Sequence, residues 1–548
     1  MKIYHIALLV VFTFPVNSFS SSISVSLEQQ AISQEHTISN TLKKLSPTQQ
    51  AILTPQTEEL SDGVFFPQEK SCWKVKKVVL ISQEDPGSFI RHLSQSANGR
   101  CLGVVGVSNL QRAMQNYIIE QGLITTRVII SNYHQATGAL TVIIAYGRVG
   151  EIKLTANSSH YFHPDFTFPL RHNEVLNLRN IEQGLENMNL MPNAVSTIRI
   201  VPGEEPGQSD IEVFRKQSKY WRLTTWADDS GSRATGRYQG GLALFLDNVT
   251  SLNDVFYGSI TRNFPASGNR GNNYRSLNYS IPYGFWSLNL FTGNSRYHQQ
   301  IMGNGISYRY LGASEYWGGQ ISRTLWRGRS QKTTLSSQLL QRKYYYYLND
   351  TEINLQRSRL SSLKLSVNHL HYFERAKINL SLDYTKSMSW FNARREADAA
   401  RPFSHIIRAN ASLLSPFSWS DFSLRYLGEL SLQTSNYALP IQDKSSIGDR
   451  TTVRGFSGDY KLLGSSGGYW RNTIALDSRY IQPYAGIDYG YIMKKNDDFG
   501  GALAGGVIGL RASKWNAYVD IFAGAPLIKP MALPADQTVL GFSVQMNF

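Results

Sequence analysis

One serine lies in a pattern that could carry nucleophilic catalysis. Gly464, Ser466 and Gly468 match the G-x-S-x-G motif, in which a sharp turn presents a serine nucleophile. That motif needs a strand before the serine and a helix after it. Here the glycine-rich stretch leads into YWRNTIALD, a run that favours another strand. We therefore interpret the match as a flexible loop and not as a nucleophile elbow.

Two close histidine pairs could contribute metal ligands. His160 and His163 flank a Tyr-Phe dipeptide in an expected loop, and His369 and His371 share one face of an expected strand. Neither pair has companion ligands at metal-site spacing, so surface or lumen histidines are the better interpretation. The sequence also has no phosphate-binding loop and no dinucleotide fingerprint. It predicts no catalytic residues, no metal site and no cofactor.

An arginine and a phenylalanine share a glycine-rich turn in Thr451–Tyr460 (TTVRGFSGDY). The flanking segments favour β-strands. A guanidinium in such a turn can form a bidentate pair with a carboxylate if the site is desolvated. On sequence physics alone, however, the favoured interpretation of Arg454 is an ordinary surface arginine of a solvated loop.

The amino-terminal residues resemble an export signal. Lys2 is followed by the apolar run 6–14 and then by Pro15, with Ser18 and Ser20 at signal-peptidase spacing. We expect residues 1–20 to be a signal peptide, because the apolar run is too short to span a bilayer. No other run approaches ~20 apolar residues, so no membrane helix is expected in the mature chain.

The charge balance is basic, with 55 Lys and Arg against 40 Asp and Glu and a net charge of +15. A basic balance is compatible with nucleic acid, an acidic surface or a cationic pore. The excess is spread through strand-like sequence without a dense basic run or a nucleic-acid motif, so no nucleic-acid partner is predicted. Cys72 and Cys101 are the two cysteines, and in an exported protein they favour one structural disulfide over two unpaired thiols.

The first 218 residues divide into four segments. Residues 21–45 contain a weakly amphipathic helix, and residues 46–69 are expected to be a linker because they contain Pro47, Pro55 and Pro67. Residues 70–147 predict an α+β unit with a strand near 75–81, a helix over 108–121 and strands at 125–130 and 139–146. Residues 148–218 repeat this order, with a helix through Leu178 and Met188, which suggests a tandem repeat.

From about residue 219 to residue 548 the hydrophobic period changes to two. Leu380, Leu382 and Tyr384 alternate with polar residues, and the final run alternates from Leu540 to Phe548. Such alternation over so long a region is typical of an antiparallel transmembrane β-barrel, in which closure pairs every backbone group. Allowing ~10 residues per strand plus turns, the region predicts sixteen strands. A soluble sandwich is the alternative, but it rarely contains so much continuous strand.

Several stretches resemble one known family. SSIGDRTTVRGFSGDYKLLGSSGGYWRNTIAL, around the turn described above, resembles the long loop of two-partner secretion outer-membrane transporters (TpsB, the ShlB/FhaC/HecB haemolysin secretion/activation family). This family is a branch of the larger outer-membrane assembly superfamily, whose members combine POTRA domains with a barrel. The resemblance extends over 176–213, 226–248, 484–490 and 518–530, and thus over essentially the whole mature chain.

The resemblance implies an architecture and a set of site residues. Residues 70–147 and 148–218 would be two periplasmic POTRA domains, residues 21–45 a plug helix in the pore, and residues 219–548 a sixteen-stranded barrel. A loop over about 434–468 would fold into the lumen and pair its arginine with Asp488, which Gly486 and Gly490 flank. This chain departs from the family pattern at Gly486, where the family has an aromatic residue. The family tetrad corresponds to Val453, Arg454, Gly455 and Phe456.

The same resemblance implies function and partners. The protein would be an outer-membrane pore of a Gram-negative cell that recognises and secretes one large exoprotein of haemolysin, adhesin or contact-dependent toxin type, and activation of that exoprotein is a further role that the resemblance implies. The POTRA domains would bind the amino-terminal secretion domain of that exoprotein. The barrel would contact outer-membrane lipid, and the terminal Phe548 would signal insertion by the barrel assembly machinery. A barrel-assembly factor and a passive porin are the alternative functions.

Overall fold

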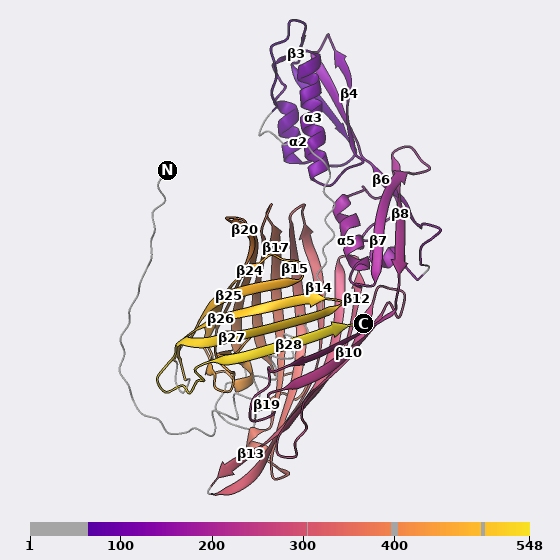
Figure 1. Ribbon diagram of the computed structural model, residues 1–548. Coiled ribbons are helices and arrows are strands. Elements are labelled where there is room, and N and C mark those ends of the chain that lie inside the picture. The colour runs from indigo at the N-terminus through magenta and orange to yellow at the C-terminus, as the bar shows by residue number, and fades with distance from the viewer. Residues whose placement is uncertain (1–63, 160, 304, 396–403, 495–498) are drawn as a thin grey trace.

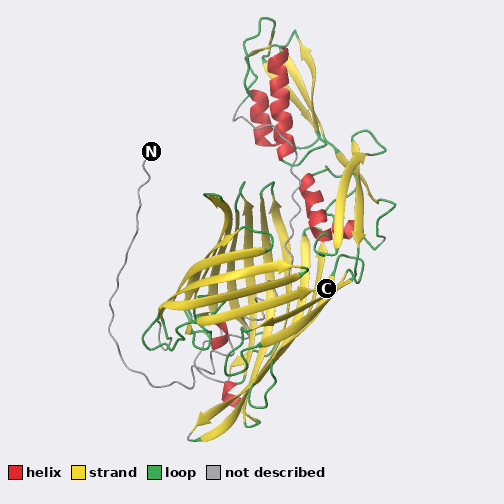
Figure 2. Ribbon diagram, in the orientation of Figure 1, coloured by secondary structure: helices red, strands yellow, loops and turns green. Residues whose placement is uncertain are grey.

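The computed structural model describes residues 64–159, 161–303, 305–395, 404–494 and 499–548. The expected signal peptide, the plug helix and most of the linker therefore lie outside the described residues. In the described part of the chain, no helix is long and apolar enough to cross a membrane. Figure 2 shows that α-helices belong to the amino-terminal part and that strands make up most of the remainder.

The first unit is a three-stranded sheet covered by two helices. Its order is β2-β5-β4, with β2 and β5 parallel and β4 and β5 antiparallel. Buried apolar residues such as Leu110, Met114 and Val142 form the core between the helices and the sheet. The helix α2 was not predicted, because Pro86 and Gly87 open a short polar segment that resembles a turn. The elements are β1 (Trp73–Lys74), β2 (Lys77–Ser82), α2 (Gly87–Gln95), β3 (Cys101–Leu102), α3 (Val104–Glu120), β4 (Arg127–His134) and β5 (Ala139–Ala145).

The second unit repeats this pairing. Its sheet has the order β6-β8-β7, with β6 parallel to β8 and β7 antiparallel to it. Leu178, Ile181, Leu185 and Met188 of its long helix point into the core, as their helical spacing predicts. The common strand pairing agrees with the tandem repeat predicted from the sequence. The elements are β6 (Arg148–Leu154), α4 (Pro164–Thr167), α5 (Leu178–Met188), β7 (Ala194–Pro202) and β8 (Gln208–Gln217).

The described end of the expected linker is docked onto the first unit. Val64 and Phe66 pack against its core, and the carboxylate of Glu69 accepts hydrogen bonds from the backbone N–H groups of Gly103, Val105 and Gly106. These donors belong to the start of α3, where backbone N–H groups have no helical partner. The backbone hydrogen bonds lower the pKa of Glu69, since they stabilise its ionised form.

The remaining strands form a closed antiparallel barrel, which confirms the predicted fold class and strand count. The first strand, β9, pairs with β10 on one side and with the last strand, β28, on the other. The short strands β16 (Thr351–Glu352) and β19 (Arg394–Arg395) add local pairings. The sixteen long strands are β9 (Trp221–Asp228), β10 (Gln239–Asp247), β11 (Val255–Asn263), β12 (Gly271–Tyr283), β13 (Trp286–Gly303), β14 (Ile306–Arg327), β15 (Gln331–Leu348), β17 (Ser358–Tyr372), β18 (Lys377–Met388), β20 (His405–Trp419), β21 (Phe422–Thr434), β24 (Gly467–Leu476), β25 (Ile481–Ile492), β26 (Gly501–Lys514), β27 (Ala517–Ile528) and β28 (Val539–Asn547).

Side chains alternate between the two faces of the barrel wall. Leu380, Leu382 and Tyr384 are exposed on the outer face, as the sequence pattern predicts. Polar residues are buried on the inner face, where Ser259 and Ser276 of neighbouring strands hydrogen-bond at 2.7 Å. The second unit contacts one end of the barrel, and the first unit lies farther from it (Figure 1). The carboxyl terminus, which follows the last strand β28, lies at the barrel end that the second unit contacts (Figure 1).

Candidate functional site

A long loop between β21 and β24 lies inside the barrel. This inward loop, residues 435–466, contains the 3₁₀ turn η2 (Ile441–Asp443) and the short strands β22 (Ser445–Ile447) and β23 (Leu462–Gly464), which pair with each other. Its tip contacts side chains of β24 and β25 that point into the lumen. The loop tip therefore lies against the inner face of the wall.

Arg454 at the loop tip forms a bidentate pair with Asp488 of β25. Its Nε donates to Oδ2 at 2.6 Å, and its Nη2 donates to Oδ1 at 2.7 Å. The backbone N–H of Arg454 donates to the same carboxylate at 3.0 Å. Both side chains are almost fully buried, with exposures of 4% and 0%. We call this pair the latch. Because it is buried and bidentate, it fixes both the position and the orientation of the loop tip.

The adjacent strand β24 completes the polar environment of the latch. Arg454 Nη2 also donates to the Asn472 carbonyl at 3.0 Å and to Thr473 Oγ1 at 2.9 Å. The Asn472 backbone N–H donates to Asp488 Oδ1 at 3.2 Å. Sequence reasoning missed both β24 residues, because neither has a distinctive motif. Their bonds offset the cost of burying the two charges.

Glycines let the loop tip lie flat on the wall. Gly455 has φ +97°, and a β-carbon there would stand 2.4 Å from the Ala525 carbonyl oxygen. On β25, a β-carbon at Gly486 would stand 2.5 Å from Arg454 Nη2, and one at Gly490 would stand 2.8 Å from Val453 Cγ2. The sequence singled out these three glycines. It missed Gly505 and Gly524 on the next two strands, which contact the backbone of the loop tip.

The apolar members of the tetrad anchor the tip in a small core inside the barrel. Val453 and Phe456 are buried together with residues of the loop and of the wall. The wall contributes Ile492 and Leu503 from β25 and β26. The core therefore adds hydrophobic burial to the latch on the same segment of chain. Its remaining buried members are Ile447, Leu462 and Leu533.

A second set of ionic contacts holds the base of the tip. Asp449 accepts hydrogen bonds from Thr451 and Thr452 and pairs with Lys461 at 2.6 Å. Arg450 pairs with Asp229, which follows β9, at 2.9 Å, and also donates to the Phe542 carbonyl of β28. The tip is therefore attached both to β25 and to the junction of the first and last strands.

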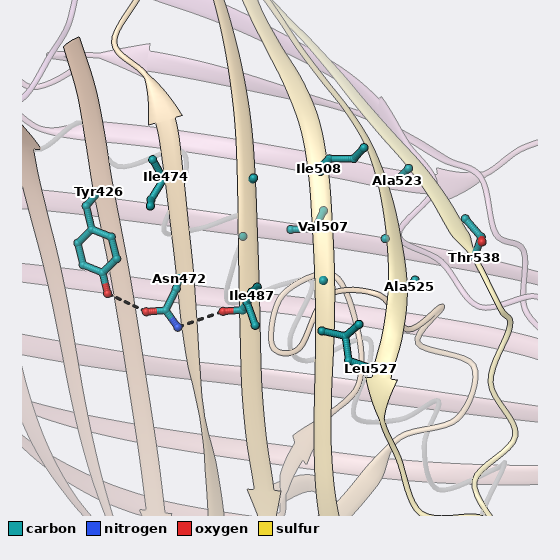
Figure 3. Close-up of a pocket in the computed structure, with 14 residues that line it drawn as sticks. Tyr426, Asn472, Ile474, Ile487, Val507, Ile508, Ala523, Ala525, Leu527 and Thr538 are labelled. Carbon is teal, nitrogen blue, oxygen red and sulfur yellow. Dashed lines mark hydrogen bonds between the residues drawn. The ribbon is translucent and has the colours of Figure 1, made fainter. Parts of the chain in front are cut away.

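The outer wall directly behind the latch has a shallow hollow. Small and apolar residues of β25, β26 and β27 line most of it, among them Ile487, Ile508 and Ala525, and its volume is about 650 Å³. Asn472 lies at its edge, where it accepts from Tyr426 and donates to the Ile487 carbonyl (Figure 3). These bonds satisfy a polar side chain on the lipid-facing side of the wall.

The rejected catalytic patterns have no catalytic surroundings. Ser466 is buried between β23 and β24, and its hydroxyl interacts with the Ser435 backbone. A strand follows it, so the strand–turn–helix context of a nucleophile elbow is absent. His371 contacts Gln331, while His369 contacts Thr333. Within the described ranges, no group of three His, Cys, Asp or Glu residues could hold a metal ion.

Cys72 and Cys101 form a disulfide in the first unit, which confirms the predicted bond. It ties the residue just before β1 to the first residue of β3, the strand that pairs with β1. The chain positions that it joins are 29 residues apart. It lies far from the latch in the chain and belongs to the amino-terminal part.

The second unit is fixed to the barrel by a buried polar network. Arg327, at the end of β14, pairs with Glu182 and Glu186 of α5 at 3.4 and 2.6 Å, and Lys332 of β15 also pairs with Glu186. Asn187 of α5 donates to the carbonyl of Gly284, between β12 and β13, at 2.8 Å. Burial opposes ionisation of Glu186, but Lys332 and Arg327 outweigh this and lower its pKa.

The carboxyl-terminal Phe548 lies beside the first barrel strand. Its backbone N–H donates to the Leu223 carbonyl at 2.8 Å, and its ring is exposed at the outer surface. The aromatic terminus therefore lies on the outer side of the β9–β28 junction, at the barrel end nearest the second unit.

Comparisons with known proteins agree with this architecture. The family described as haemolysin secretion/activation protein ShlB/FhaC/HecB matches residues 207–512, and a POTRA domain family matches residues 148–202. The outer membrane transporter CdiB-2 of Burkholderia pseudomallei is 30% identical over 478 residues, which cover 85% of this chain and 82% of that protein. CdiB of Dickeya dadantii is 29% identical, with 87% of each chain covered.

Solved structures give the same result. CdiB from Escherichia coli superposes with a TM-score of 0.84 at 25% identity and covers 97% of this chain and 100% of its own. The matched family residues make up more than half of the 548 residues. The chain therefore belongs to the haemolysin secretion/activation protein ShlB/FhaC/HecB family, and it is a two-partner secretion transporter of the outer membrane with its POTRA part in the periplasm.

Proposed function

We propose that this transporter exports one large exoprotein, in an unfolded state, through its barrel to the cell surface. A cargo of haemolysin, adhesin or contact-dependent toxin type fits the family. The observation that carries the proposal is a closed barrel with polar inner residues and a loop latched against the inner wall. A polar lumen suits the passage of an unfolded chain, whose backbone groups remain hydrated.

Mass spectrometry of culture supernatants tests this proposal. Cells with the transporter should release one large protein that cells without it retain. A complementing copy with the native sequence should restore that single protein. Unchanged supernatants, together with steady ion conductance, would instead indicate a passive porin. Accumulation of misassembled barrels would indicate an assembly factor.

The latch has a positioning role in this proposal. Arg454 and Asp488 keep the tetrad Val453–Phe456 on the wall, so that the inward loop forms a fixed part of the lumen during export. The glycines on β25 to β27 support the role, since they leave room for the loop backbone. No covalent chemistry is required at this site, which fits a transporter that is not an enzyme.

Cargo capture is assigned to the POTRA part. In the second unit, β7 lies at an edge of the three-stranded sheet, and Val195 on this strand is 62% exposed. An unpaired edge can accept an extended segment of the cargo's secretion domain by β-augmentation. A photo-crosslinking residue at Val195 should capture the cargo. The same residue at Glu151 of β6, the opposite edge, provides the matched control.

Outward movement would be driven by folding of the cargo outside the cell, because no nucleotide is available at the outer membrane. A cargo variant that cannot fold at the surface should stall in the pore, and a normal export rate for that variant would contradict this step. Insertion of the transporter itself is assigned to the barrel assembly machinery, with exposed Phe548 as the recognised terminus. Deletion of Phe548 should lower the amount of inserted barrel.

A further inference from the structure

A line of charged and polar side chains crosses the outer face of five neighbouring strands. Arg275 of β12, Asn294 of β13, Glu315 of β14, Lys343 of β15 and Arg359 of β17 are successive cross-strand partners. They occupy outward positions, because they alternate with inward residues such as Tyr274 and Tyr344. Opposite residues in adjacent strands lie about 5 Å apart, so these side chains form one continuous row.

The row contains more positive than negative charge. Glu315 is its single acid, and it lies 3.9 Å from Lys343. Arg275 and Arg359 have no acidic partner within ion-pair distance among the described residues. The next row toward the strand tips adds Arg262 and Arg296, which are likewise without an acidic partner in the described chain. Five cations thus face outward in two rows against one carboxylate.

An apolar hollow lies beside this row. Its volume is about 600 Å³, and Leu242, Leu244, Ile260 and Leu277 line its floor. Gly258 helps to open it, since a β-carbon there would stand 3.1 Å from Leu277 Cδ2. Arg275, Asn294, Glu315 and Lys343 belong to the lining of the same hollow. It therefore has an apolar part and a predominantly cationic rim, which is the arrangement that an anionic amphiphile requires.

Aromatic residues flank the hollow on the β17 side. Trp317 lines it, and the ring of Phe391 packs on Trp317 with a centroid distance of 5.1 Å. The Phe391 carbonyl accepts from Gln341, and the neighbouring Trp390 carbonyl accepts from Ser361. Both aromatic side chains remain about half exposed on the outer face. Exposed aromatic residues at this level are typical of the boundary between the apolar band and the headgroups.

We propose that this hollow binds a phosphorylated lipid of the outer leaflet. Arg275, Lys343 and Arg359 lie in the halves of β12, β15 and β17 away from the POTRA units, because Gly284 after β12 and Lys332 at the start of β15 contact the second unit. β13 continues beyond the row to the far tip of the barrel (Figure 1). With the POTRA units in the periplasm, this places the row toward the outer leaflet. The lipid phosphate is held at Arg275 and Lys343, and its acyl chains lie on the leucine floor. Charge complementarity identifies the occupant, because phosphate is the anion that cationic rows at a membrane surface recognise.

Native mass spectrometry of the full-length transporter in detergent tests the proposal. The probes are purified lipopolysaccharide and the same lipid after enzymatic removal of its phosphates. The test variant combines Arg275→Gln and Lys343→Gln. Its control combines Arg323→Gln and Arg479→Gln, which removes two charges near the POTRA end of the barrel. A third variant, Gly258→Leu, fills the hollow and leaves its charges in place.

The native protein should bind the phosphorylated lipid. Each lost cation should weaken binding by roughly five- to tenfold, so the affinity of the double test variant should be about 30-fold lower. The control should bind like the native protein, and Gly258→Leu should also weaken binding. Equal binding of the dephosphorylated lipid, or equal binding by the test and control variants, would overturn the proposal. If the native protein were dimeric, and the test variant were monomeric but bound the lipid normally, the proposal would be wrong and the hollow would be an interface with a second copy of the chain. Heat-modifiable mobility on gels verifies that each variant has a folded barrel.

Discussion

Arg454 at the loop tip and Gly505 of the barrel wall are in direct contact inside the lumen: a β-carbon built on Gly505 would stand 1.7 Å from the Arg454 carbonyl oxygen. Gly505 belongs to β26, where the register with β27 shifts between Ala504 and Gly505. The latch therefore depends on close backbone packing as well as on charge. The wall must carry glycines where the loop tip lies, because larger side chains there would keep the Arg454 guanidinium from reaching Asp488.

Replacement of Gly505 by alanine should displace the inward loop. The added methyl group would contact backbone, which cannot move away as a flexible side chain can, so the Arg454–Asp488 pair should open. Limited proteolysis of residues 435–466 should become faster, and secretion should fall by about tenfold or more, which corresponds to at least ~1.4 kcal/mol. Gly506→Ala is the matched control, because its nearest neighbour would be Leu527 Cδ1 at 3.7 Å. Equal proteolysis of the two variants would contradict this account.

Removal of the Asp488 charge should also release the loop. Asp488→Asn keeps the shape of the side chain but leaves the Arg454 guanidinium buried without a counter-ion, at a cost of about 3–5 kcal/mol. We expect larger and noisier conductance in planar bilayers and a loss of secreted cargo. Asp520→Asn removes an acid that pairs with Arg511 on the same wall and does not contact the loop, and it should behave like the native protein. Identical single-channel recordings for the two variants would exclude a role for the latch.

The sequence predicted those parts of the molecule in which the hydrophobic periodicity of an element matches the face that the element buries in the folded protein. Alternation at Leu380, Leu382 and Tyr384 identified the outer face of the barrel, because each strand is apolar on one side over its whole length. The helix α5 was predicted for the same reason, through Leu178, Ile181, Leu185 and Met188. In contrast, α2 was missed, since Pro86 and Gly87 at its start are also typical of a turn.

Site residues that act through distant contacts could not be predicted from local pattern. The pairing of Arg454 with Asp488 came from the family resemblance and not from periodicity or spacing. Arg450 and Asp229 are 221 positions apart, and nothing near either residue indicates the other. The turn at Asp449 did leave a signal, because an Asp two and three residues before the threonines Thr451 and Thr452 favours capping of their backbone N–H groups by the carboxylate.

The attachment of the second unit to the barrel should depend on Glu186. Glu186→Gln removes the acid shared by Arg327 and Lys332, at a cost of about 3 kcal/mol for a largely buried pair. Spin labels at Glu204 and Arg329 would report the distance between the unit and the barrel, and the variant should broaden its distribution. Glu174→Gln, at an exposed site of the same unit, should leave the distribution narrow. Similar broadening in both variants would show that the network does not hold the unit.

Acid should weaken the same attachment in the native protein. The pKa of Glu186 is lowered in the folded state, so ionised Glu186 contributes its full stabilisation above the unfolded value of about 4.3. That contribution is lost as the pH falls through the depressed folded pKa. The distance distribution should therefore stay constant from about pH 8 to pH 5 and broaden only below about pH 4. Broadening between pH 6 and pH 7 would point to a different titrating group.

Reduction of the disulfide should destabilise the first unit selectively. The Cys72–Cys101 bond closes a loop whose ends are 29 positions apart, and loop-closure entropy then predicts a loss of about 3–4 kcal/mol. In full-length protein treated with dithiothreitol, protease cleavage within residues 64–147 should accelerate, whereas the second unit and the barrel, which contain no cysteine, should remain resistant. A Cys72→Ser/Cys101→Ser variant should be cleaved rapidly with or without reductant, because it already lacks the bond. If instead reductant accelerated cleavage of this variant as much as that of the native chain, the effect would not come from the disulfide.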